Sequence, residues 1–438
     1  METKFDTTID YSQKQAENSS YSFSKIVPLS GVQTVTPGQD VQYELPPIAM
    51  NLARSYFSGS LTVPAQTAIA PATTAHSWLH RGIVPFSAVS LYTRQGQYLC
   101  DLRQDATRYT RVVNSADATA QELESGDESG VLYTANDSKS YLGGKAGNGS
   151  TAKGYQQQAY VTASADLAAQ TWNFKIPFSA IKRTIFALDR SILFNQVLVL
   201  KIKMADTGDL AYHSDSATNP DSNAANLNVT AGFQITNSCL FICTERNSEI
   251  VQSLVTATRT NEGMTFLCEY PTTFSQTRST TQQNISIRLN RSFGASLLSV
   301  KNCVFGNGAN NLKYDRDTSA SSKVVSYYTD INGNRLLDFN PVVADQEPWM
   351  IHKDRLSNTP ALNRTIYEEN WFHEDRFDNG VRQYRDGEVD DSTYAGVSLD
   401  DEIRYNISYT TANATHSHYT IAHCIKVLNI NASGLVIS

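Results

Sequence analysis

Four side chains near the end of the sequence could bind a metal ion. His416, His418, His423 and Cys424 carry the imidazole and thiol groups that zinc prefers, and a zinc site needs three or four such ligands in tetrahedral geometry. If the segment is a β-strand, His416 and His418 share one face, while His423 falls on the opposite face from His418 unless a bulge intervenes. We therefore interpret these residues as core or interface histidines and expect no bound metal.

A second group of oxygen ligands resembles a calcium loop only loosely. Asp330, Asn332 and Asn334 alternate as in an EF-hand, but that loop needs Gly at position six and Glu at position twelve. Counted from Asp330, position six is Arg335, and position twelve is not Glu. An Asn-Gly pair between two apolar runs is a strong signal for a two-residue hairpin turn. We therefore expect a hairpin at Asn332-Gly333.

The remaining patterns that suggest catalysis are incomplete. The stretch Gly143–Gly149 is not a phosphate-binding loop, because Gly144-Lys145 is followed by Ala146 and no apolar strand precedes it. Two acidic residues that are adjacent in the sequence do not indicate whether their carboxyl groups lie roughly 5–10 Å apart across a cleft, as a glycosidase pair must. No Gly-x-Ser-x-Gly elbow is present for a hydrolase nucleophile. The sequence therefore predicts no enzyme and no cofactor. The adjacent acidic pairs in the sequence are Glu368/Glu369 and Asp400/Asp401.

The overall composition excludes several classes of protein. Of 438 residues, 10% are aromatic and only 18% are charged, which does not suit a disordered chain. The net charge of −7 leaves no surplus of Lys and Arg, so we expect no direct sequence-specific binding of nucleic acid. The cysteines are widely spaced and several lie in apolar runs, so we interpret them as reduced. They are Cys100, Cys239, Cys243, Cys268, Cys303 and Cys424.

Alternation of apolar and polar residues with a period of two is the dominant pattern. Antiparallel strands with one buried face show this alternation, and it places Trp172, Phe174, Ile285 and Ile287 in the expected core. The strand-like runs fall into two sets of about eight, the number in a jelly roll. The first set is 41–44, 56–63, 88–93, 98–102, 159–163, 171–176, 193–204 and 233–243. The second is 264–270, 284–289, 296–305, 324–329, 335–339, 403–410, 419–427 and 435–437.

Three short helices are expected between the strands. The segment 247–256 has apolar residues at helical spacing, with Asn247 or Ser248 as its N-cap, and we place the boundary between the two halves there. A second helix is expected after Ser179. A third is expected to begin at Thr359-Pro360, where proline suits the first helical position. The apolar stripes are Ile250, Val251, Leu254 and Val255; Ile181, Ile185 and Leu188; and Leu362, Ile366, Tyr367 and Trp371.

Long polar stretches interrupt both sets of strands. Segments of this length usually carry function or are disordered, so we expect loops that form much of the outer surface. The stretch 103–158 is the longest, is rich in acidic residues and has few large aliphatic side chains. We expect it to stand in solvent or to lean on a neighbouring subunit. The other stretches are 206–228, 306–323 and 377–401.

Several segments resemble the double jelly-roll major capsid proteins of icosahedral DNA viruses. Leu45-Pro46 through Leu61 looks like an early strand of their first jelly roll. The passage from Ile176-Pro177-Phe178 through Met204 is similar to the helix-then-strand passage of the same half. Glu347-Pro348-Trp349-Met350 through Asn370-Trp371-Phe372 resembles the insertion of the second half. The resemblance runs from about Ser20 to the C-terminus and covers the adenovirus hexon-like, tectivirus-like and Polinton-like virus lineage.

This resemblance implies an all-β chain of two consecutive eight-stranded antiparallel jelly rolls with short helices and long loop insertions. We divide the chain into a polar N-terminal arm 1–20, a first jelly roll 21–246 with the outer loop 103–158, a linking helix 247–256, and a second jelly roll 257–438 with insertions 306–323 and 340–402. The two halves also suggest a divergent duplication, because Phe233-Gln234-Ile235 before Cys239 parallels Tyr419-Thr420-Ile421 before Cys424.

The resemblance further implies a structural major capsid protein that forms homotrimeric, pseudo-hexagonal capsomers in the virion. Implied partners are other copies of the chain, neighbouring capsomers, and penton and minor capsid proteins. The N-terminal arm is a further candidate for contact with an inner membrane. Two alternatives remain: a receptor- or carbohydrate-binding spike protein that uses exposed Trp and Tyr, and a β-sandwich glycosidase.

Overall fold

The computed structural model describes most of the strand framework and part of the insertions. The described residues are 19–63, 66–67, 75–79, 85–103, 106–117, 132–135, 160–163, 166–167, 170–205, 211–214, 225–226, 233–288, 296–306, 324–335, 340, 373–376, 401–410 and 412–437. None of the described helices has the length and apolar character of a membrane span.

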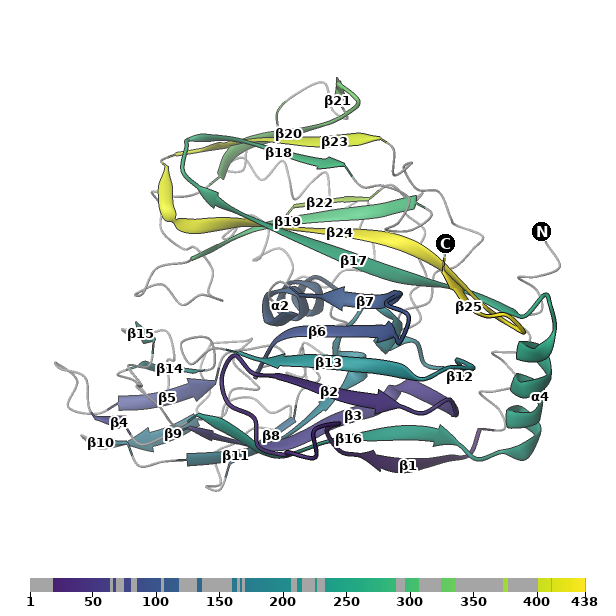
Figure 1. Ribbon diagram of the computed structural model, residues 1–438. Helices are drawn as coiled ribbons and strands as arrows, with labels where there is room; N and C mark the ends of the chain where they lie inside the picture. The colour runs from purple at the N-terminus through teal and green to yellow at the C-terminus, as the bar shows by residue number, and fades with distance from the viewer. Residues whose placement is uncertain are drawn as a thin grey trace.

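The first half of the chain forms a sandwich of two antiparallel sheets (Figure 1). One sheet has the order β1-β16-β3-β11, with β8 next to β11 and β12 paired to β3; the other has the order β2-β13-β6-β7. The bounds are β1 Tyr21–Ile26, β2 Asp40–Leu45, β3 Ala49–Val63, β6 Phe86–Thr93, β7 Tyr98–Leu102, β8 Leu132–Ala135, β11 Gln170–Pro177, β12 Ser191–Leu193, β13 Leu198–Met204 and β16 Gln234–Glu245.

The second half forms another sandwich with the orders β17-β24-β19-β22 and β18-β23-β20-β21, and β25 pairs with β24. The bounds are β17 Met264–Arg278, β18 Gln282–Arg288, β19 Ser296–Gly306, β20 Val324–Ile331, β21 Asn334–Arg335, β22 His373–Arg376, β23 Glu402–Tyr409, β24 Asn413–Asn431 and β25 Gly434–Ile437. Numbered along the chain, the eight principal strands of each half pair in the orders 1-8-3-6 and 2-7-4-5. This shared order makes both halves jelly rolls and confirms the predicted all-β double jelly roll.

The predicted set of eight strands is wrong by one member in each half. In the first half, β1 is missed, because Phe23 is 53% exposed and the strand buries no full apolar face. In the second half, β22 is missed, because its sequence is His-Glu-Asp-Arg. Two predicted strands lie outside the eight: the run at 159–163 becomes β9 (Tyr160–Ala163) in a separate sheet, and the run at 435–437 becomes β25.

The apolar core follows the predicted alternation. Phe174, Ile285 and Ile287 are buried as expected, whereas the side chain of Trp172 lies outside the described residues. Along β18 every second residue is buried, which is the period-two pattern of a strand with one core face. One apolar cluster continues from the first sandwich into β17, β19 and β24, and a second fills the interior of the second sandwich.

A helix lies at the segment 247–256, as predicted, and extends beyond its C-terminal bound. Helix α4 spans Ser248–Arg259, and the Asn247 side chain accepts a hydrogen bond of 2.9 Å from the Glu249 amide. Asn247 is one of the two predicted N-caps, and its side chain satisfies one of the free amides of the first turn. Ile250 and Leu254 are buried on its inner side.

Neither of the other two predicted helices is found as an α-helix among the described residues. After Ser179 there are two 3₁₀ turns, η1 Phe178–Ala180 and η2 Ile185–Ala187, because Arg183 adopts a left-handed backbone (φ 58°) that no α-helix accommodates. The helix expected at Thr359-Pro360 lies outside the described residues. The unpredicted helix α2, Ala106–Asp117, packs on β6 with Tyr109 and Val113 buried. The segment 103–158 is therefore not a single structureless loop.

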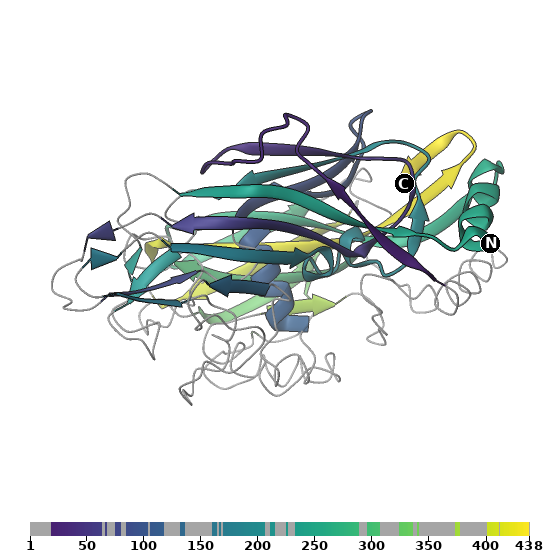
Figure 2. The ribbon, with the colours of Figure 1, turned by 90° about the horizontal axis from the view of Figure 1, so that it is seen from below.

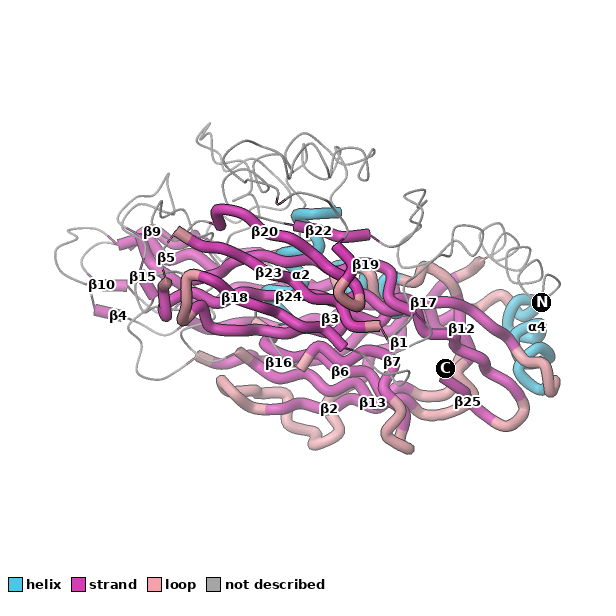
Figure 3. Tube along the Cα trace, turned by 90° about the horizontal axis from the view of Figure 1, so that it is seen from above, coloured by secondary structure: helices cyan, strands magenta, loops and turns pink. Residues whose placement is uncertain are grey.

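The two sandwiches give the molecule two distinct ends. Their strands run along a common long axis (Figure 2), with the start of β1, helix α4 and β25 at one end (Figure 1). At the other end, insertions between the strands of the first jelly roll build extra small sheets (Figure 3). One has the order β15-β14-β5-β9, with β5 Ala75–Leu79, β14 Ala211–Ser214 and β15 Ala225–Asn226; the other pairs β10 Asp166–Leu167 with β4 Gln66–Thr67.

Candidate functional site: the junction of the two sandwiches

The two jelly rolls meet where the edge strand β7 of the first lies against β17 of the second (Figure 1). The turn η2 also contacts β17. Because one apolar cluster is continuous across this contact, the interface resembles a domain core more than a loose contact between domains. Polar groups are concentrated at two places within it.

The first place is a buried ion pair between residues from different halves. Arg183 Nε donates to Glu269 Oε2 at 2.7 Å, and Arg183 Nη2 reaches Glu269 Oε1 at 3.3 Å and Ser299 Oγ at 3.0 Å. The side chains are 3% and 0% exposed. Two parallel bonds between a guanidinium and a carboxylate fix the direction as well as the distance of approach. Arg183 lies between η1 and η2 with a left-handed backbone, and η2 contacts β17, the strand that carries Glu269.

Helix α2 completes this part of the junction. His423 of β24 is fully buried, with its Nδ1 3.8 Å from Glu269 Oε2. The Tyr109 ring of α2 lies 6.1 Å from the His423 ring, and the Tyr109 hydroxyl donates to the Lys182 carbonyl at 2.8 Å. Part of the segment 103–158 is thus built into the contact between the sandwiches.

The second place surrounds Lys426 of β24. Its Nζ donates to the Tyr98 carbonyl of β7 at 3.2 Å and lies 3.7 Å from the centre of the Tyr270 ring. Burial lowers the pKa of the Lys426 ammonium and raises the pKa of the Cys268 thiol, which is opposite Lys426 in the β17–β24 pairing, to about 12. Burial also holds the pKa of Cys100 well above its ordinary value. Since the thiolate is the reactive form, these thiols are packing groups at neutral pH.

The structure does not bring the suspected metal ligands together. His418 lies inside the second sandwich, where its Nδ1 is 2.9 Å from the Tyr409 hydroxyl and its Nε2 is 3.1 Å from Asn302 Oδ1. His423 instead faces Glu269 at the junction, Cys424 packs in the core of the second sandwich, and the side chain of His416 lies outside the described residues. Among the described residues, no three His, Cys, Asp or Glu side chains are grouped closely enough to hold a metal ion.

The calcium-like triplet is a hairpin, as predicted. β20 pairs with β21 across a two-residue turn in which Asn332 (φ 52°) and Gly333 (φ 82°) are both left-handed. The Asn332 amide donates to Asp401 Oδ1 at 2.8 Å, and its oxygen accepts from the Glu402 amide. Asp401 therefore closes a turn. Gly143–Gly149, Glu368/Glu369 and Asp400 lie outside the described residues. All six cysteines are buried, and none of them forms a disulfide.

A second polar network joins the N-terminal end of β1 to the linking helix. Glu245, at the end of β16, is 3% exposed and accepts from the amides of Ser20, Arg246 and Asn247 and from the Ser191 hydroxyl. One carboxylate thus fixes the start of β1 and the residue that caps α4.

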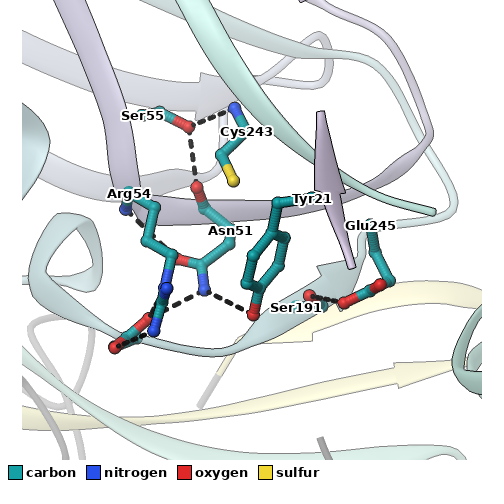
Figure 4. A network of polar contacts seen from close by, with 8 residues as sticks. Tyr21, Asn51, Arg54, Ser55, Ser191, Cys243 and Glu245 are labelled. Carbon is teal, nitrogen blue, oxygen red and sulfur yellow. Dashed lines mark hydrogen bonds and ion pairs between the residues drawn. The ribbon is translucent and has the colours of Figure 1, made fainter. Parts of the chain in front are cut away.

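Beside Glu245, the buried Asn51 donates to Asp189 at 2.8 Å and to the Tyr21 hydroxyl at 3.4 Å (Figure 4). Asp189 also binds Arg54, whose Nε lies 2.8 Å from Asp189 Oδ1 and whose side chain is 52% exposed. Ser55 links Asn51 to β16, since its hydroxyl donates to the Asn51 carbonyl and accepts from the Cys243 amide.

The sequence analysis did not identify the junction or this network. Arg183 and Glu269 are separated by 86 positions, so no local spacing relates them. The one usable signal is that Glu269 interrupts the apolar stretch Phe266 to Tyr270, where a charged residue needs a partner when buried. Arg183 follows Lys182 and precedes Thr184, so it has no comparable signal.

The fold consists of two successive jelly rolls on one chain, and solved major capsid proteins have a similar fold. The chain aligns with the Faustovirus major capsid protein over 94% of its own length and 91% of that chain, with a TM-score of 0.55 and 11% identity. It aligns with the mavirus major capsid protein over 95% and 90%, with a TM-score of 0.54 and 10% identity.

A chain of the Sputnik virophage matches over 96% of this chain and 88% of its own, with a TM-score of 0.57 and 10% identity. No protein-family model matches the sequence, and a search of curated proteins finds no relative. The likeness is thus one of fold, and it extends over nearly the whole chain.

Proposed function

We propose that this protein is the major capsid protein of an icosahedral DNA virus and that it assembles as a homotrimer. Three chains bring six jelly rolls together, which gives a pseudo-hexagonal capsomer that can tile a shell. The observation that carries the proposal is the repeated strand order 1-8-3-6 and 2-7-4-5 in two sandwiches of one chain. The whole-length likeness to solved capsid proteins supports it.

The junction suits this role. A shell subunit must keep its two sandwiches at one relative angle, because any rotation between them would break the pseudo-hexagonal outline. A continuous apolar core together with the Arg183–Glu269 pair holds that angle. The arrangement favours a structural role over the glycosidase and spike alternatives, since Arg183, Glu269 and His423 face one another within the fold.

The two ends of the molecule suggest its orientation in the shell. We infer that the end with α4 and the start of β1 faces inward, so that the N-terminal arm 1–20 can contact an inner membrane or minor capsid proteins. The opposite end, with its insertions, then faces outward. The division into jelly rolls 21–246 and 257–438 joined by the linking helix 247–256 is part of this proposal, as are the virion location and contact with penton proteins.

The decisive experiment measures the oligomer. Purified full-length protein should give a mass of three times 48.4 kDa by light scattering, and the particles should show a pseudo-hexagonal outline in negative stain. The trimer should bury more than the roughly 1,200–2,000 Å² of a standard interface. A folded monomer that persists at micromolar concentration would contradict the proposal.

The proposed orientation has its own test. Limited proteolysis of intact particles should cut near Lys145 or Lys153 in the segment 103–158 without disassembly, because exposed loop tips are the preferred sites of nicking. Cleavage confined to the first 20 residues, with full protection at Lys145 and Lys153, would place that segment inside the shell or at an interface.

A further inference from the structure

The outer face of the sheet β1-β16-β3-β11 carries an aromatic patch made of Phe23, Tyr56 and Phe241. The ring centres of Phe23 in β1 and Phe241 in β16 lie 5.6 Å and 4.9 Å from that of Tyr56 in β3. Phe23 is 53% exposed, and the other two residues are half-buried. The patch therefore leaves aromatic surface in water that burial against a partner would remove.

The exposed apolar side chains of the molecule are concentrated at this place. Among the described residues, seven large hydrophobic side chains are exposed, and four of them lie between positions 23 and 32. The loop after β1 is held in place by its backbone, since the Leu29 amide donates to the Gln42 carbonyl and the Gly31 amide to the Pro28 carbonyl, both at 2.8 Å. An ordered segment that presents apolar side chains to water is typical of an interaction surface. The four residues are Phe23, Val27, Leu29 and Val32.

The charges beside the aromatic patch are positive. Lys25 of β1 and Lys175 of β11 are both exposed, and Lys175 Nζ lies 5.2 Å from the centre of the Tyr56 ring. The Arg54–Asp189 pair near the start of β1 is neutral as a whole. Because the chain carries a net charge of −7, the rest of it is net negative and complements a patch flanked by two lysines.

We propose that the aromatic patch is the contact through which the first jelly roll of one chain binds the second jelly roll of a neighbouring chain. This inference rests on the proposed trimer and assigns a surface to it. In a ring of six jelly rolls each has two neighbours, and within a chain the first meets the second through β7 and β17. The sheet with the patch lies on the side of the first sandwich away from the second (Figure 1), where the neighbour from another chain must lie.

The charge of the patch sets the symmetry of the contact. A two-fold contact places the same patch of both copies face to face, so Lys25 and Lys175 of one copy would meet those of the other. Contact with a different, net negative surface avoids this repulsion, and head-to-tail contacts of this kind can close into rings. The composition also suits an interface, because aromatic residues are enriched at the centre and charged residues lie at the rim.

Sedimentation equilibrium of the full-length protein tests the contact. Phe23→Glu places a carboxylate at the centre of the patch, where the interface would bury it, so the protein concentration at which trimers dissociate should rise about tenfold or more. The circular dichroism spectrum should stay that of the parent, because Phe23 is exposed within the chain. Val436→Glu is the matched control, since Val436 is 49% exposed on β25, outside the patch, and it should leave the trimer unchanged.

A photoreactive benzoylphenylalanine in place of Phe23 identifies what covers the patch. In trimers mixed from isotope-labelled and unlabelled chains, cross-links from position 23 should reach residues 257–438 of a different chain. Cross-links between the patches of two chains, or to residues 21–246 of the neighbour, would overturn the inference. This measurement keeps an aromatic ring at position 23 and so does not depend on the folding of Phe23→Glu.

The inference and the proposed function fail in different ways. Parent trimers that remain intact in Phe23→Glu, or that Val436→Glu weakens equally, would overturn the assignment of the patch and leave the trimer itself in place. A parent protein that stays monomeric contradicts the proposed function, and the inference falls with it.

Discussion

Two Arg–carboxylate pairs of nearly equal geometry lie in different surroundings. In the pair Arg183–Glu269, the guanidinium Nε is 2.7 Å from the carboxylate; in the pair Arg54–Asp189 the distance is 2.8 Å, and in both a second nitrogen reaches the other oxygen. The side chains of the first pair are 3% and 0% exposed, and those of the second are 52% and 42% exposed.

The difference in burial decides what each pair contributes. An exposed pair is screened by water and salt, so it adds roughly 0–1 kcal/mol whatever its geometry. A buried pair gains little over apolar residues of the same volume, yet loss of one partner leaves a charge without compensation. The Arg183–Glu269 pair therefore fixes the position of one sandwich against the other, and the Arg54–Asp189 pair supports the polar network of Asn51 and Glu245.

The largest effect is expected for Glu269→Ala. This substitution leaves Arg183 buried without its carboxylate, so the free energy of unfolding in a denaturant titration should fall by about 3–5 kcal/mol. The double variant Arg183→Met/Glu269→Leu should recover most of that loss, because apolar residues can replace a buried pair. A loss below about 1 kcal/mol in Glu269→Ala would mean that burial at the junction does not distinguish the two pairs.

Truncation of a buried apolar residue gives a loss of stability with which the loss at the ion pair can be compared. Ile287 is 3% exposed in the core of the second sandwich, so Ile287→Ala should lower the free energy of unfolding by about 2–5 kcal/mol. The neighbouring Arg288 is exposed, and Arg288→Ala should stay within about 0.5 kcal/mol of the parent protein. An unchanged melting temperature in Ile287→Ala would show that the register of β18 is wrong.

The sequence predicts those features of the structure that depend on residues close to one another in the chain. The alternation along β18, the cap at Asn247 and the Asn332-Gly333 turn are local, and each appears where the sequence predicts it. β1 and β22 were missed because both are edge strands of their sheets and lack an apolar face. Their pairing depends on backbone bonds to β16 and β19, which leave no pattern in the sequence.

The candidate site could not be predicted from short sequence patterns, for a related reason. The junction pairs Arg183 with Glu269, which are 86 positions apart in the chain. The histidines at 418 and 423 share one strand yet take different roles, because the two faces of β24 meet different neighbours. The sequence shows that the two histidines lie on opposite faces of the strand. It does not show which residues pack against each face.

A smaller effect is expected where the linking helix begins. Asn247→Ala removes the cap that accepts from the Glu249 amide, so the free energy of unfolding should fall by about 1 kcal/mol. Asn247→Asp keeps a capping oxygen and should be close to the parent protein. Equal losses in both variants would mean that the loss does not come from the capping oxygen. No loss in either variant would leave the role of Asn247 to its backbone amide, which both variants keep and which donates to Glu245.

The smallest effect is expected for Arg54→Ala, and its dependence on salt completes the comparison. The free energy of unfolding should fall by less than about 1 kcal/mol at low ionic strength, and the loss should shrink further at 1 M salt, where the screening length is about 3 Å. The loss in Glu269→Ala should change little over the same range, because neither partner of that pair is accessible to ions. Parallel salt titrations of the two variants measure this directly. If both losses decline together, solvent reaches the junction, and the Arg183–Glu269 pair does not act as a buried register between the sandwiches.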